Sequence, residues 1–175
     1  MPNSAPAALL ALARAAAAQH ALDPMLVCAI VEQESAWDPH AIRYEPAFRQ
    51  RYVAPLGLPP TEEVARSISW GLMQVMGQLA REHGFRAKSL AALCDPATAL
   101  DVGCAVFAAK LHAAGTDAAP IGAAAHDTHA ASVVNHDVDA AGIVNQNLTR
   151  ALALWNGGAN PDYAAQVFAR LANYK

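Results

Sequence analysis

The chain has 175 residues, a formal net charge of −3 and 54% hydrophobic residues. About a quarter of it is alanine, the best helix former, and β-branched residues are sparse. This composition excludes an all-β fold and intrinsic disorder, and it favours a mainly α-helical single domain over residues 1–175. The chain has no basic stripe suited to nucleic acid and no apolar run of the roughly 18 residues that a membrane span needs.

The predicted helices follow the chain's Asp-Pro and Asn-Pro pairs. An amphipathic helix opens the chain; we favour it over an export signal because no positive region precedes it and Arg14 interrupts the apolar stretch. Asp23-Pro24, Asp95-Pro96 and Asn160-Pro161 each predict a helix start, since Asp can cap a helix and Pro suits its first turn. Helical spacing predicts two more helices, about 146–155 and 75–83. We expect at least six helices, with strand at most in a small element around residues 43–72.

Two stretches lack a regular period. Residues 43–68, rich in Arg, Pro and Glu, predict a loop with a short helix. Residues 114–144, a low-complexity Ala/Asp/His tract, predict a loop insertion. The spacing of His126, His129 and His136 suits a zinc site, but we favour a polar loop and expect neither a metal nor a cofactor.

The three cysteines have apolar helical surroundings. Cys28, Cys94 and Cys104 predict buried free thiols, with a Cys94–Cys104 disulfide as the alternative.

Glu34 is the first candidate for chemistry, because it lies in the last predicted turn of the helix that Asp23-Pro24 opens. The negative end of the helix dipole and apolar neighbours, here Ile30 and Trp37, both raise the pKa of a carboxyl. A carboxylic acid that stays protonated near neutral pH is what cleavage of a glycosidic bond needs. Read locally, Glu34 could equally be a solvated helix-end glutamate.

Two later segments carry residue types suited to sugars. In 69–76 (SWGLMQVM), a glycine between bulky groups predicts a close backbone approach, and Gln74 can both donate and accept hydrogen bonds. In 151–158 (ALALWNGG), a predicted helix ends by placing Trp155 and Asn156 at a loop edge, and Tyr163 follows. Each segment alone also fits an ordinary core or helix end.

Together these segments resemble the lytic transglycosylase family with the soluble-transglycosylase (SLT) type of catalytic domain, related in fold to goose-type lysozyme. The matching motifs, in order, are Glu34 to Ala41, Ser69 with Gly71 to Gln74, Leu93 to Pro96 with Gly103, and Trp155 to Gly158 with Tyr163 to Val167. The resemblance implies a lysozyme-like domain that cleaves the MurNAc-β-1,4-GlcNAc bond of peptidoglycan. It implies Glu34 as acid and then base, giving a 1,6-anhydro product. It also implies a cleft lined by Ser69, Gly71, Met73, Gln74, Trp155, Asn156 and Tyr163.

The chain departs from the family pattern in three places. Trp155 stands where the family has a tyrosine that contacts the catalytic acid, and Trp offers a donor but no acceptor. The long stretch after Glu34 contains Glu45, a candidate second carboxylate that would activate water as in a goose-type muramidase. The alternative for Glu45 is an ion pair with Arg43, Arg49 or Arg51. The insertion at 114–144 has no counterpart.

Two further readings stay open: a chitin-active enzyme of the same fold and a non-catalytic cell-wall-binding component. The predicted partner is the peptidoglycan glycan strand, and the predicted place of action is the cell wall, in the periplasm or outside the cell. Because no export signal is convincing, we expect delivery by a phage lysis system with a holin, or by an injection or secretion machine. We expect a monomer.

Overall fold

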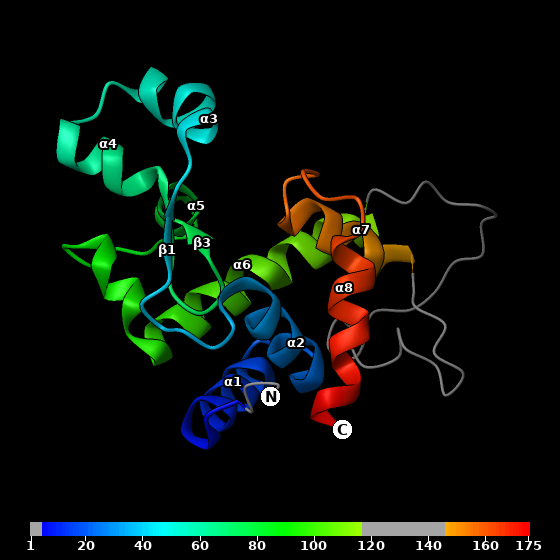
Figure 1. The fold of residues 1–175 in the computed structure, drawn as a ribbon. Coiled ribbons are helices and arrows are strands. Elements are labelled where there is room, and N and C mark those ends of the chain that lie inside the picture. The colour runs from blue at the N-terminus through cyan, green and yellow to red at the C-terminus, as the bar shows by residue number, and fades with distance from the viewer. Residues whose placement is uncertain (1–4, 117–145) are drawn as a thin grey trace, which may run out of the picture.

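The computed structural model describes residues 5–116 and 146–175, and within these ranges the fold is mainly α-helical (Figure 1). The predicted fold class is confirmed. The α-helices are α1 (Ala7–Gln19), α2 (Pro24–Ser35), α3 (Pro46–Phe48), α4 (Pro60–Arg66), α5 (Gly77–Glu82), α6 (Pro96–Thr116), α7 (Gln146–Trp155) and α8 (Tyr163–Arg170). Shorter helical turns are η1 (Arg49–Val53), η2 (Ala54–Leu56), η3 (Leu90–Cys94) and η5 (Leu171–Tyr174).

Two of the three predicted helix starts, those at Asp23-Pro24 and Asp95-Pro96, are confirmed. The Asp23 side chain accepts the backbone N–H groups of Met25 and Leu26 at 2.7 and 3.3 Å, and the first turn of α6 is capped by Asp95 in the same way. Asn160 instead accepts the N–H of Asp162, so a turn intervenes and α8 begins at Tyr163. The predicted bounds of α7 agree with the structure.

A three-stranded antiparallel sheet joins β1 (Ile42–Tyr44), β2 (Ile68–Trp70) and β3 (Val75–Met76) in that order. The predicted strand region was too narrow, because β3 takes residues 75–76 and the next helix begins only at Gly77. Backbone turns with positive φ at Gly71 (65°) and Gln74 (47°) fold this segment back onto β2. Residues 43–68 also hold more helix than the single short one predicted.

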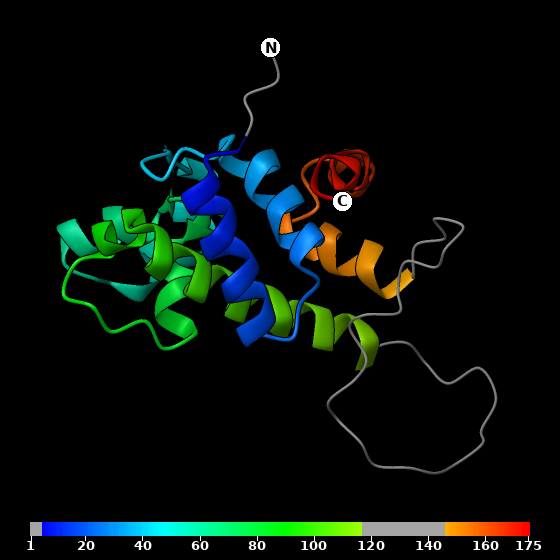
Figure 2. The same ribbon diagram turned by 90° about the horizontal axis from the view of Figure 1, so that it is seen from below.

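Helix α6 is the centre of the core. It packs against α1 and α7, and Figure 2 shows α1 lying beside α2 and over α6. Leu100 and Phe107 of α6 are fully buried. Among the described residues one helix, Pro96–Gly115, is long and apolar enough by length and composition to cross a membrane. This corrects the expectation that no run reaches that length, although a core helix has the same composition.

Cys28, Cys94 and Cys104 are free thiols, so the alternative disulfide does not form. Of the predicted insertion, residues 114–116 still belong to α6, because Ala114 is buried against the core. The remainder, with His126, His129 and His136, lies outside the described residues. Within the described ranges, no group of three metal-ligating side chains occurs.

Candidate active site

The end of α2 forms the base of the site. Glu34 lies in its last turn, as predicted, and the helix ends because Ala36 and Trp37 adopt left-handed backbone conformations, with φ of 49° and 68°. The Ser35 hydroxyl is shared between the carbonyl of Val31 in its own helix at 3.1 Å and that of Leu72 at 2.9 Å. This contact attaches the end of α2 to the turn between β2 and β3.

Two donors converge on one oxygen of Glu34. Its Oε1 accepts a hydrogen bond from Trp155 Nε1 at 2.9 Å and another from the Tyr163 hydroxyl at 2.5 Å. Trp155 is the last residue of α7 and Tyr163 the first of α8, so the two helix ends hold the carboxyl between them. Oε1 therefore acts as an acceptor, and the proton of the neutral acid belongs on Oε2. The residues described supply no hydrogen-bond partner for Oε2.

Burial raises the pKa of Glu34 above its ordinary value, because water no longer stabilises the charged form. The hydrogen bond from Tyr163, then that from Trp155, and then the charge of Arg43 oppose this shift, but burial outweighs them. Burial is also the main reason that the pKa of Tyr163 is raised, so its phenol stays protonated and keeps donating. The raised pKa favours the neutral form of Glu34, and two donors lie on its Oε1.

The packing around α7 and α8 fixes these donors. The Trp155 ring meets the Phe107 ring of α6 edge-on, with centroids 5.6 Å apart, and Tyr163 is almost fully buried. The Asn156 side chain donates to the carbonyl of Asn160 at 3.2 Å, which closes the loop between the two helices. Asn156 thus shapes the loop that brings Trp155 and Tyr163 together.

Gln74 and Ser69, both expected in the cleft, form an internal network. The Ser69 hydroxyl donates to Gln74 Oε1 at 2.8 Å, and Gln74 Nε2 donates to the carbonyls of Ala41 and Gly71, both at 2.9 Å. Both amide protons of Gln74 are therefore used within the protein. The network holds the β2–β3 turn to the segment that precedes β1.

Gly71 and Met73, also expected in the cleft, are buried. A Cβ at Gly71 would lie 2.1 Å from the carbonyl oxygen of Leu93, and one at Gly103 would lie 2.4 Å from Met73 Sδ. These residues allow the turn to pack closely on η3 and α6. Their burial, like that of Ser69, gives these residues a packing role, and their contact with substrate stays a prediction.

Trp37 and Glu45, which the sequence placed near the acid, both contact other residues. Trp37 packs against Tyr174 and donates to its hydroxyl at 2.9 Å, so the indole that contacts Glu34 is that of Trp155. Glu45 forms an ion pair with Arg43 at 2.5 Å, which is the alternative reading of this residue. Arg43 is a site residue that the motifs did not single out; its charge acts on Glu34 from β1.

The fold and the site define a lysozyme-like helical domain with one half-buried carboxyl held between two side-chain donors. A family model described as "Transglycosylase SLT domain" matches residues 11–165, a range that includes Glu34, Trp155 and Tyr163. The chain belongs to this family of transglycosylases that act on peptidoglycan, which confirms the predicted resemblance. Neither the curated proteins nor the solved structures give a match to the chain.

Proposed function

We propose that the chain cleaves the MurNAc-β-1,4-GlcNAc bond of peptidoglycan with Glu34 as the acid and then the base. The observation that carries the proposal is the pair of donors on Glu34 Oε1, from Trp155 at 2.9 Å and Tyr163 at 2.5 Å. These donors leave Oε2 to carry the proton toward a substrate. Burial raises the pKa of Glu34, which favours the protonated form that a general acid requires.

In the first step Oε2 of Glu34 gives its proton to the glycosidic oxygen as the bond to the muramyl C1 breaks. The resulting carboxylate is stabilised by the hydrogen bonds from Trp155 and Tyr163, which strengthen when their acceptor becomes charged. In the second step the carboxylate takes the proton of the muramyl 6-hydroxyl while that oxygen bonds to C1. The product is a 1,6-anhydromuramyl end, and Glu34 returns to its protonated form.

Hydrolysis with Glu45 as a second carboxylate is the other candidate. It is favoured by the position of the Arg43–Glu45 ion pair, since the charge of Arg43 is felt by Glu34. In this scheme Glu45 would hold a water molecule as general base. Against it, the Glu45 carboxylate is already paired with Arg43, whereas one carboxyl is enough for transglycosylation because the nucleophile belongs to the substrate.

Mass spectrometry of the fragments released from purified peptidoglycan separates the two schemes. We expect anhydromuropeptides, and we expect Glu45→Gln to release them as well. Reducing ends, lost together with activity in Glu45→Gln, would instead establish the hydrolytic scheme. Release of fragments from GlcNAc oligomers but not from peptidoglycan would overturn both and favour a chitin-active enzyme.

A further inference from the structure

Two neighbouring residues at the end of α2 each contact α8. Glu34 accepts from the Tyr163 hydroxyl, and Gln33 Nε2 donates to Gln166 Oε1 at 2.9 Å. Tyr163 and Gln166 lie three residues apart in α8, which places them on one face of a helix that packs against α2 (Figure 2). The contact between Gln33 and Gln166 therefore runs beside the contact between the acid and its donor.

Gln166 also holds the loop between α7 and α8. Its Oε1 accepts a second hydrogen bond, from Asn160 Nδ2 at 3.1 Å. The carbonyl of Asn160 in turn accepts from the Asn156 side chain and from the backbone N–H of Tyr163, both at 3.2 Å. One amide oxygen thus links α2 to the 156–162 loop, at whose two ends the donors Trp155 and Tyr163 lie.

The amide of Gln33 is only half satisfied. Its Nε2 donates to Gln166, but its buried Oε1 accepts no hydrogen bond within the described ranges. A buried acceptor without a donor is unfavourable and offsets the gain from the Nε2 contact. The position that this contact gives to the adjacent Glu34 therefore explains it better than a contribution to stability does.

We propose that Gln166 is a positioning residue for the two donors on Glu34. It acts by linking the end of α2 to the 156–162 loop. The proposal rests on the proposed function, because it concerns how the same acid is held. A hydrogen bond weakens steeply with distance and angle, so its donors need fixed positions. Without the link, α2 and the loop can shift relative to each other, and both donors act on Glu34 less effectively.

A double-mutant cycle on the pKa of Glu34 tests the proposal, measured by carbon-13 NMR of glutamate-labelled protein. Tyr163→Phe removes a donor and should raise this pKa in the wild-type background. The same substitution should raise it less in Gln33→Met and in Gln166→Leu, because the donor is already badly placed there. Water that enters a loosened site acts on Glu34 with and without the Tyr163 hydroxyl, so it does not produce this result.

Gln33→Met separates position from stability. It removes the donor to Gln166 together with the unpaired Oε1, and Asn160 still donates to Gln166, so no buried polar group loses its last partner. Because methionine suits a helix as well as glutamine does, Tm should change by less than about 3 °C. The kcat on purified walls should still fall about three- to tenfold, the effect of one lost hydrogen bond. Gln166→Leu removes both contacts and should lower kcat at least as much.

A nearby control removes a different link between α2 and the segment after α8. The Tyr174 hydroxyl donates to Glu32 at 2.6 Å and accepts from Trp37 at 2.9 Å. Tyr174→Phe breaks both contacts and should lower Tm. Because the link through Gln166 stays intact, the effect of Tyr163→Phe on the pKa should be as large as in the wild type.

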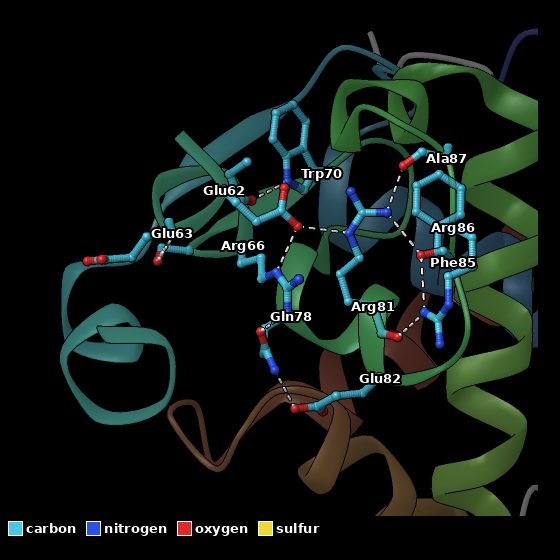
Figure 3. A network of polar contacts seen from close by, with 12 residues as sticks. Glu62, Glu63, Arg66, Trp70, Gln78, Arg81, Glu82, Phe85, Arg86 and Ala87 are labelled. Atoms are coloured by element: carbon cyan, nitrogen blue, oxygen red, sulfur yellow. Dashed lines mark hydrogen bonds and ion pairs between the residues drawn. The ribbon is translucent and has the colours of Figure 1, made fainter. Parts of the chain in front are cut away.

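A distant control weakens a polar network between α4 and α5. Figure 3 shows Arg66 and Arg81 converging on Glu62, whose Oε1 accepts from their Nε atoms at 2.8 and 3.0 Å. Glu62→Gln removes the charge that the two guanidinium groups share and should lower Tm. It too should leave the effect of Tyr163→Phe unchanged.

The outcomes separate this proposal from the proposed function. The cycle observes the Glu34 carboxyl without substrate, so wild-type protein that releases no wall fragments contradicts the proposed function, and the cycle still decides on Gln166. An equal rise of the pKa in the wild type, Gln33→Met and Gln166→Leu overturns the positioning proposal alone. A rise that is reduced equally in the two controls also overturns it, because general loosening would then account for the result.

Discussion

The end of α2 and the β2–β3 turn meet at Ser35, yet their side chains are used differently. At the end of α2, Glu34 has one oxygen held by two donors and a second oxygen that the described residues leave without a partner. In the turn, Gln74 uses both amide protons inside the protein, and Met73 is fully buried. Both regions carry family motifs, but the first leaves one carboxyl oxygen available, whereas the polar groups of the second are engaged within the protein.

The largest expected effect is a loss of activity on substitution of Glu34, at the end of α2. Glu34→Gln keeps the acceptor oxygen for Trp155 and Tyr163 but has no acidic proton, so release of wall fragments should fall by about 10²–10⁴-fold. Turbidity loss of purified walls measures it. Glu32→Gln, in the same helix, is the matched control and should retain activity within a fewfold. If both variants lose activity to a similar extent, the loss reflects damage to helix α2 and not the missing acidic proton.

On the positioning side, the largest effect is expected at Gly71. Gly71→Ala combines a positive φ of 65° with a backbone oxygen 2.1 Å from the new Cβ, so the free energy of unfolding should fall by at least about 2 kcal/mol. Gly57→Ala has a similar φ of 63° and open space, and should cost about 1 kcal/mol. Urea denaturation measures both. Equal losses would mean that close packing on Leu93 contributes nothing.

Removing a donor from Glu34 should change the pH profile. Tyr163 and Trp155 both lower the pKa of Glu34, so Tyr163→Phe and Trp155→Phe should each raise it further. Activity that needs the protonated acid is lost as the pH rises through this pKa, so the alkaline limb of kcat should move to higher pH. We expect kcat itself to fall about tenfold, because the charged intermediate loses a hydrogen bond.

Trp155→Tyr tests the departure from the family pattern, since it restores the family residue. A tyrosine that reaches Glu34 can still donate, so this variant should keep an alkaline limb close to that of the wild type. If the pH profile of Trp155→Tyr matches that of Trp155→Phe, the tyrosine hydroxyl does not reach Glu34. Only the indole N–H then has the right position to donate to the carboxyl.

The smallest effect is expected at Ser69. Ser69→Ala removes the donor to Gln74 Oε1 and should lower the free energy of unfolding by about 1 kcal/mol, with kcat changed less than threefold. Thermal unfolding and steady-state kinetics on walls measure the two quantities. A large loss of kcat at unchanged stability would return Ser69 to the substrate-binding residues that the motif implies.

The sequence could predict the features that residues close together in the chain determine. The Asp23 cap, the bounds of α7 and the position of Glu34 in the last turn of α2 depend on a few adjacent positions. The hydrogen bond between Tyr163 and Glu34 joins residues 129 positions apart, and no local pattern specifies its geometry. The motif order indicated that these residues belong to one site, but not which of them contact one another.

The sequence also could not separate exposed from buried motif residues. Glycine and methionine suit a cleft or a core equally well. Only the packing on η3 and α6 shows that Gly71 and Met73 lie in the core. Likewise β3 depends on the left-handed backbone at Gln74, a conformation that glutamine rarely adopts and that its own hydrogen bonds stabilise here. Tertiary contacts, not local preference, decide these positions.

The most direct test of the account is a titration of the Glu34 carboxyl in the folded protein. Carbon-13 NMR of glutamate-labelled protein, with Glu34→Gln to assign the signal, gives its pKa. The account predicts a value above the ordinary 4.3 or so of a glutamate, and a higher one still in Tyr163→Phe. A pKa at or below the ordinary value would contradict it, because Glu34 would then be ionised at neutral pH and hold no proton for the glycosidic oxygen.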